Sequence, residues 1–116
     1  LKIMSDPSKV DDAILSFTLG ENEKAITILR KISEESPECI DAWRALAEVN
    51  LAIGEVSLAE DACRQALEID PKDLTSMVSL ARILVKKGDK KGAEEASAKA
   101  RILGWQDELA QEKEEL

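Results

Sequence analysis

The stretch QALEIDPKD, residues 65–73, holds the end of one helix and the start of another. Apolar residues at helical spacing stop at Asp70, because Pro71 has no amide hydrogen and disfavours the α conformation in the residue before it. Proline nevertheless suits the first position of a helix, and an aspartate before it is a good N-cap. We therefore predict that one helix ends here and that the next begins at once, with Asp70 as its N-cap.

The same boundary recurs along the chain with a fixed period. Pro37 and Pro71 lie 34 residues apart. Two further sets of residues repeat at this spacing: Gly20, Gly54 and Gly88, and Ala25, Ala59 and Ala93. Each of these glycines follows a helix-like segment and precedes an acidic residue, which is typical of a left-handed glycine at a helix C-terminus. Each period therefore contains two helices.

A two-helix period of 34 residues resembles the tetratricopeptide repeat (TPR). The second copy, residues 40–73, agrees with the pattern of that family at Trp43, Leu46, Ala47, Gly54, Ala59, Ala66 and Pro71. The third copy, residues 74–107, agrees at Leu80, Ala81, Gly88, Ala93 and Ala100, with Met77 in place of the tryptophan. The resemblance implies an all-α, TPR-type α-solenoid of three helix-turn-helix repeats plus a C-terminal capping helix.

The first copy, residues 6–39, is degenerate. It keeps the family pattern at Ala13, Gly20, Ala25, Ile32 and Pro37. Lys9 and Asp12, however, stand at the tryptophan and leucine positions, and the short distance from Pro7 to Gly20 predicts a first helix about one turn shorter. Residues 1–5 are interpreted as a tail or as the remnant of an upstream repeat, in which case the chain is part of a longer protein.

The C-terminal residues are interpreted as the capping helix. We expect Gly104 to end the third repeat, and Trp105 and Leu109 to cover its last apolar face. Residues 108–116, which include four glutamates, would complete the cap. Repeat stacks need a polar terminal element of this kind for solubility.

The net charge of −8 is unevenly distributed. Residues 6–73 contain sixteen acids and seven bases, whereas residues 74–107 contain four acids and seven bases. The acidic balance argues against a nucleic-acid partner, which needs a basic face. A cluster of lysines surrounds Gly88 and is either a docking patch for an acidic partner or a solvated turn: Lys86, Lys87, Lys90 and Lys91. No apolar run is long enough for membrane insertion, and we expect a cytoplasmic protein unless an upstream signal or anchor has been removed.

Histidine and cysteine, which often serve as general base, nucleophile or metal ligand, are scarce, whereas the abundant carboxylates are interpreted as solvating surface charges. The chain has no histidine and two cysteines. We interpret Cys63 as a small buried thiol, and Cys39 as a residue of a first helical turn without a neighbouring base. No glycine-rich phosphate loop is present. We therefore expect neither an enzyme nor a cofactor or metal site.

Partner binding is the function that the TPR resemblance implies. In that family one face of each first helix lines a concave groove that holds a peptide or helix of a partner. The matching positions here are Val10, Ile14 and Phe17, then Arg44, Glu48 and Leu51, then Val78, Arg82 and Val85. Arg44 and Arg82 would pair with acidic groups of the ligand. The alternative for Val10, Ile14 and Phe17 is that upstream chain or a second subunit covers them.

Co-chaperone TPR domains grip a carboxylate with lysine, asparagine and arginine on the first helices. This chain has none of these at the corresponding positions: Val10, Ile14, Ala45, Thr75 and Ser79. Binding of a chaperone tail is therefore disfavoured. The sequence predicts a protein–protein interaction module, a scaffold or adaptor. The alternatives are a structural or oligomerisation segment of a larger assembly, with possible self-association, and a regulatory segment of an enzyme.

Overall fold

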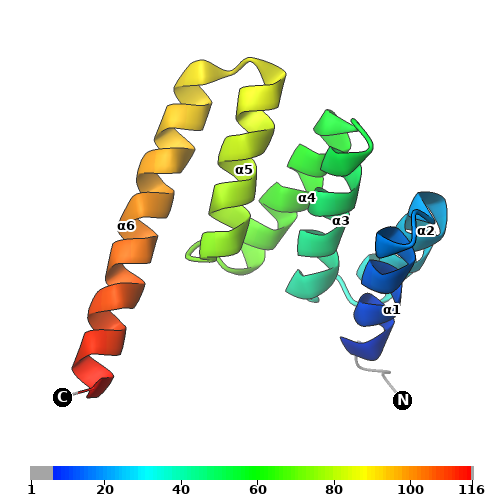
Figure 1. Cartoon of the computed structure of the whole chain (residues 1–116), viewed down its shortest axis with the longest axis horizontal. Coiled ribbons are helices and arrows are strands. Elements are labelled where there is room, and N and C mark those ends of the chain that lie inside the picture. The colour runs from blue at the N-terminus through cyan, green and yellow to red at the C-terminus, as the bar shows by residue number, and fades with distance from the viewer. Residues whose placement is uncertain (1–6, 116) are drawn as a thin grey trace.

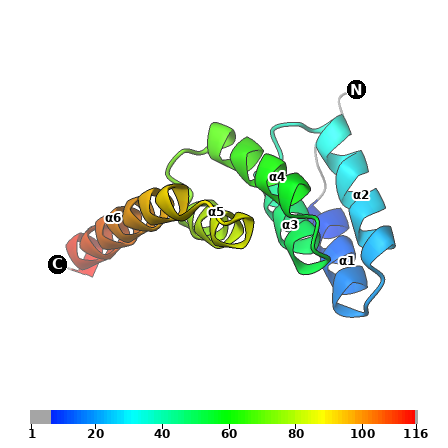
Figure 2. The ribbon, with the colours of Figure 1, turned by 90° about the horizontal axis from the view of Figure 1, so that it is seen from above.

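The computed structural model describes residues 7–115, which form six helices and no strand. The helices are α1 (Pro7–Thr18), α2 (Asn22–Glu35), α3 (Ile40–Ala52), α4 (Val56–Ile69), α5 (Leu74–Lys87) and α6 (Lys90–Glu115). Each helix packs on the next one in the chain, and α3 also contacts both α1 and α5 (Figures 1 and 2). The predicted all-α stack of helix pairs is confirmed.

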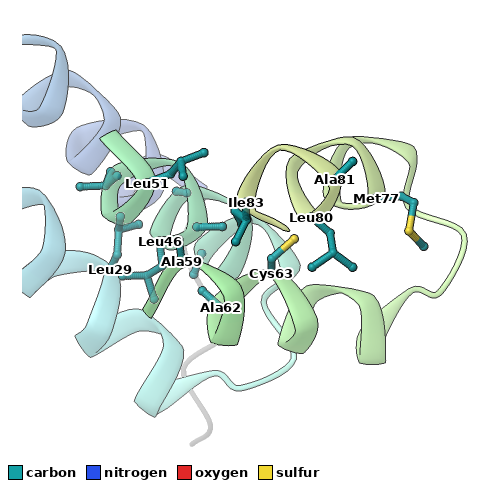
Figure 3. Close-up of a cluster of buried hydrophobic side chains, with 14 of the residues drawn as sticks. Leu29, Leu46, Leu51, Ala59, Ala62, Cys63, Met77, Leu80, Ala81 and Ile83 are labelled. Carbon is teal, nitrogen blue, oxygen red and sulfur yellow. The ribbon is translucent and has the colours of Figure 1, made fainter. Parts of the chain in front are cut away.

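Small side chains at the helix contacts hold the pairs together. Ala59 and Ala93 are buried where the second helix of each pair meets its neighbours, which allows the backbones to approach closely. Larger apolar side chains fill the space between the pairs, and among them Leu29, Ile83 and Val49 are fully buried. Figure 3 shows this cluster extending from α2 across α3 and α4 to α5, so neighbouring repeats share one core.

The three repeated glycines take the predicted left-handed conformation. The φ angles of Gly20, Gly54 and Gly88 are +84°, +86° and +82°. An L side chain disfavours this region because its Cβ crowds the following carbonyl oxygen. Each glycine therefore lets one helix stop, and the next one starts two residues later.

The proline boundaries differ from the prediction. Asp70 is the C-cap of α4, and the N-cap of α5 is Asp73, whose side chain accepts a hydrogen bond from the amide of Ser76. Pro71 occupies the second position of a β-turn that the amide of Asp73 closes by donating to the carbonyl of Asp70 (3.1 Å). Pro37 lies in an equivalent turn. The proline therefore ends one helix, and the next helix begins three residues later.

The described part of the first helix is shorter than α3 and α5 by one and two residues, which is less than the predicted turn. The described part of α1 has 12 residues and α3 has 13. Pro7 lies inside α1, whereas Pro37 lies in the turn before α3, so the two prolines are not equivalent starting points. The predicted tail or repeat remnant at residues 1–5 lies outside the described residues.

The capping helix is not a separate element. Helix α6 continues through Gly104 to Glu115, because a single glycine inside a helix costs only about 1 kcal/mol relative to alanine. Gly104 lies beside Leu74, the first residue of α5, so the part of α6 beyond it has no helix to pack on (Figure 1). Trp105 and Leu109 are consequently 61% and 44% exposed. The prediction that they cover the third repeat is therefore wrong. Among residues 7–115, none of the helices combines the length and apolar character that a membrane crossing needs.

Two substitutions of glycine by alanine should have opposite effects on the free energy of unfolding. Gly54→Ala should lower it by about 1–2 kcal/mol, because a left-handed alanine is strained even though no atom lies within 4 Å of the added Cβ. Gly104→Ala should raise it by about 0.5–1 kcal/mol through helix propensity. Urea unfolding followed by circular dichroism measures both changes. Destabilisation by Gly104→Ala would contradict a continuous α6.

Candidate functional site

A hollow of about 450 Å³ lies between α1 and α3. On α1, residues spaced by three or four fall on one helix face, so Val10, Ile14 and Phe17 all reach the hollow. Val10 is buried at its floor, whereas Ile14 is 45% exposed. The complete lining is Val10, Asp11, Ile14, Phe17, Asp41, Arg44, Ala45, Glu48 and Val49. The site therefore has an apolar floor and a charged rim.

Arg44 on this rim is already paired. Its Nε donates to Asp73 Oδ2 (2.9 Å), and its second terminal nitrogen donates to Asp73 Oδ1. Its first terminal nitrogen donates to Asp41 Oδ1 at 2.8 Å. The hydrogen bonds from Arg44 hold the pKa of Asp73 below its ordinary value, and the same contact raises the pKa of Arg44. Arg44 thus links α3 to the residue that caps α5.

Arg82 is also paired within the protein. It lies 3.2 Å from Glu48 Oε2, and Ser79 donates to Glu48 Oε1 at 2.7 Å. Glu48 therefore connects α3 to α5 on the same face as Arg44. Since both arginines already have carboxylate partners, the structure does not support the expectation that they await acidic groups of a ligand.

The nine predicted groove residues lie in different surroundings. Five of them line the hollow: Val10, Ile14, Phe17, Arg44 and Glu48. Leu51 is buried in the core instead, and Val78 is exposed on α5 outside this lining. Val85 is 67% exposed and lines a second hollow, of about 380 Å³, together with α6.

Sequence reasoning missed four residues of the hollow: Asp11, Asp41, Ala45 and Val49. Asp41 could have been found, because it precedes Arg44 by three residues and such helical neighbours interact. Ala45 and Val49 follow Arg44 and Glu48 by one residue each and extend the lining towards the core. Asp11 has no comparable local signal.

The four lysines of the possible basic docking patch lie where α5 is followed by α6. Lys86, Lys87, Lys90 and Lys91 are all exposed around the α5–α6 turn. Lys87 pairs with Glu60 Oε1 at 2.6 Å, and this hydrogen bond, with a second from Arg64, lowers the pKa of Glu60. Within the described part of the chain the other three lysines form no ion pair, so the turn presents a positive surface.

A family model described as tetratricopeptide repeat matches residues 16–73, which is half of the chain. The chain belongs to the tetratricopeptide repeat family. No curated protein sequence matches it.

Solved TPR structures share this fold at low sequence identity. The second TPR of Spaghetti (RPAP3), bound to the HSP90 peptide SRMEEVD, has a TM-score of 0.81 at 19% identity, over 86% of this chain and 93% of its own. The Yersinia enterocolitica type III secretion chaperone SycD, in complex with a peptide of the translocator YopD, has a TM-score of 0.80 at 20% identity, over 84% of this chain and 74% of its own. MamA has a TM-score of 0.81 at 22% identity, and the match covers 84% of this chain and 57% of MamA. These identities establish a common fold.

The TPR positions that form a carboxylate clamp in co-chaperones carry no cation here. Val10, Ala45 and Ser79 are buried, and Ile14 and Thr75 have side chains that cannot form an ion pair. The free cysteines do not supply a reactive group in the hollow, since neither belongs to its lining. Burial raises the pKa of the Cys63 thiol to about 11, and its Sγ donates to the carbonyl of Ser76.

Replacing Asp73 should weaken the joint between the second and third repeats. Asp73→Asn keeps an N-cap, because asparagine caps as well as aspartate, but it removes the ion pair with Arg44. We expect the free energy of unfolding to fall by about 1–2 kcal/mol at pH 7. The matched control is Asp70→Asn, at an exposed residue whose side chain accepts from the amide of Lys72. Urea unfolding should show little change for the control.

The effect of Asp73→Asn should depend on pH. Because the pKa of Asp73 is lower in the folded state than the ordinary value of about 3.9, its stabilising contribution is complete above that value. The contribution is lost as the pH falls through the folded-state pKa. The stability difference between the parent and Asp73→Asn should therefore narrow below about pH 4. An unchanged difference between pH 7 and pH 3 would contradict this assignment.

Proposed function

We propose that this TPR chain is a protein–protein interaction module that holds a peptide or helical segment of a partner over the hollow between α1 and α3. The observation that carries the proposal is the apolar floor of the hollow, which is open at Ile14 although it lies beside the core. Monomeric proteins seldom leave such patches exposed without a binding role. The peptides bound to SycD and to the second TPR of Spaghetti support this use of the fold.

The proposed role is non-catalytic and cytoplasmic. The acidic net charge of −8 supports a protein partner rather than a nucleic acid, whose phosphates require a basic face. Both cysteines are free, and free thiols are typical of reducing compartments.

A substitution in the hollow should separate binding from folding. Ile14→Glu should lower the affinity for a peptide selected from a phage-displayed library by about tenfold or more. The substitution puts a charge where the peptide places an apolar group. The matched control is Leu15→Glu, at an exposed residue of α1 outside the lining. Fluorescence anisotropy gives the affinities, and thermal melting confirms that both variants fold. Equal losses in the two variants would contradict binding in this hollow.

A structural or oligomerisation role is the second candidate, and the free half of α6 favours it. Ile102, Trp105 and Leu109 are exposed at helical spacing on α6, and within residues 7–115 no other helix lies beside residues 105–115 (Figure 1). Residues 90–103 contain four bases and two acids, whereas residues 104–115 contain one base and five acids. Two α6 helices packed antiparallel would therefore place opposite charges together, in a symmetric dimer.

Light scattering at several protein concentrations tests this second candidate. The parent should show a concentration-dependent dimer, and replacing Trp105 and Leu109 by serine should return it to a monomer. The matched control replaces two exposed leucines by serine, Leu15 of α1 and Leu19 of the turn after it, and should leave the dimer intact. A parent that stays monomeric at every concentration would exclude the α6 dimer and leave the interaction module as the function.

A further inference from the structure

The charges around the α1–α3 hollow are unbalanced. The carboxylates on its rim and in direct contact with that rim are Asp11, Asp41, Glu48 and Asp73, and the cations are Arg44 and Arg82. Both arginines are engaged by these carboxylates. The site therefore carries two negative charges more than its cations neutralise.

Asp11 and Asp41 are the carboxylates that remain available. Among residues 9–115 no basic group lies within ion-pair distance of Asp11, which is exposed on the α1 side of the hollow. Asp41 offers one oxygen to Arg44, and its side chain is 59% exposed on the α3 side. The two acids thus flank the apolar floor from the two helices that form it.

The wider surface has the same sign. Residues 6–73, which include both helices of the hollow, contain sixteen acids and seven bases. A surface with an excess of one charge steers oppositely charged partners towards it and speeds their association.

We propose that the occupant of this hollow is a partner segment in which a bulky apolar side chain stands within one helical turn of a lysine or arginine. The inference rests on the proposed function and names the chemistry of its ligand. The apolar side chain fills the space over Val10, Ile14 and Phe17, and the cation lies between Asp11 and Asp41. Asp11 and Asp41 would contribute to the selectivity of binding more than to its affinity, because exposed ion pairs are weak.

An acidic segment would meet an obstacle in the same place. To bind it, Arg44 would have to leave Asp73, and the nearly buried carboxylate of Asp73 would lose its charged partner. Leaving a buried carboxylate without its partner is unfavourable. The arrangement therefore selects against acidic ligands as well as for basic ones.

The chain itself carries an apolar–basic segment at its other end. Val85 is exposed next to Lys86 and Lys87 in the last turn of α5. A head-to-tail contact between copies is therefore the competing occupant, and such contacts generate chains of molecules rather than closed dimers.

Two sets of synthetic peptides on one framework test the proposal with the full chain. A central leucine, phenylalanine or tryptophan is followed within four positions by lysine or arginine in one set, and by aspartate or glutamate in the other. In fluorescence anisotropy at low salt, the basic set should bind about tenfold more tightly, and added salt should reduce the difference. Tighter binding of the acidic set, with loss on Arg44→Gln, would overturn the inference and leave the proposed function standing.

A charge reversal on neighbouring residues of α1 provides the matched pair of variants. Asp11→Lys should lower the affinity for the basic peptides by about fivefold or more, since it places a like charge beside the ligand cation. Asp12→Lys makes the same change one residue away, at a side chain that lines a different depression with Lys9 and Ile28, and should have no effect. Equal losses in both variants would overturn the site by showing that only net charge matters.

Two further outcomes separate the remaining explanations. If neither peptide set binds and library-selected peptides ignore Ile14→Glu, the proposed function fails together with the inference. Light scattering could instead show open-ended association of the parent that both Lys86→Glu and Asp11→Lys abolish. The occupant is then a second copy of the chain, and the inference of a separate partner is overturned.

Discussion

The ion pair between Arg44 and Asp73 joins the second repeat to the third and, in the proposed site, limits what the hollow can bind. Asp73 caps α5 and Arg44 lies on the groove face of α3, so their contact fixes the start of the third repeat against the second. The same contact removes the cation that an acidic ligand would use. The joint between the repeats and the proposed ligand selectivity therefore depend on one pair of side chains, so a change that favours one would constrain the other.

The fold was predictable because its signals are local and repeated. The left-handed conformation of Gly20, Gly54 and Gly88 can be predicted without knowledge of distant residues. Three copies at one spacing then identify the period. The helix starts were less predictable, since proline is compatible both with a first helical turn and with the β-turn that precedes it. Gly104 was misinterpreted for a similar reason: glycine ends a helix only where the chain also turns, and nothing at that position makes α6 turn.

Five of the nine predicted groove residues line the hollow, whereas the ion pairs beside it were not predicted. The groove face follows from helical periodicity, which placed Val10, Ile14 and Phe17 correctly along one face. The pairing of Arg44 with Asp73 joins residues 29 positions apart, and no spacing rule within a helix reports it. Glu48 and Arg82 are one whole repeat apart, so comparing equivalent positions of neighbouring copies for opposite charges would have revealed that pair.

The free half of α6 has a consequence for any molecule that covers it. Residues 105–115 extend a helix that is already formed and packed on α5, so their helical state depends on the small gain of each added hydrogen bond and not on nucleation. We expect this end of α6 to fray, and a partner that needs the helix would bind only the helical fraction. Its apparent affinity is the intrinsic affinity multiplied by that fraction. Residues that touch no partner, but that set the helical population, can then tune recognition from a distance.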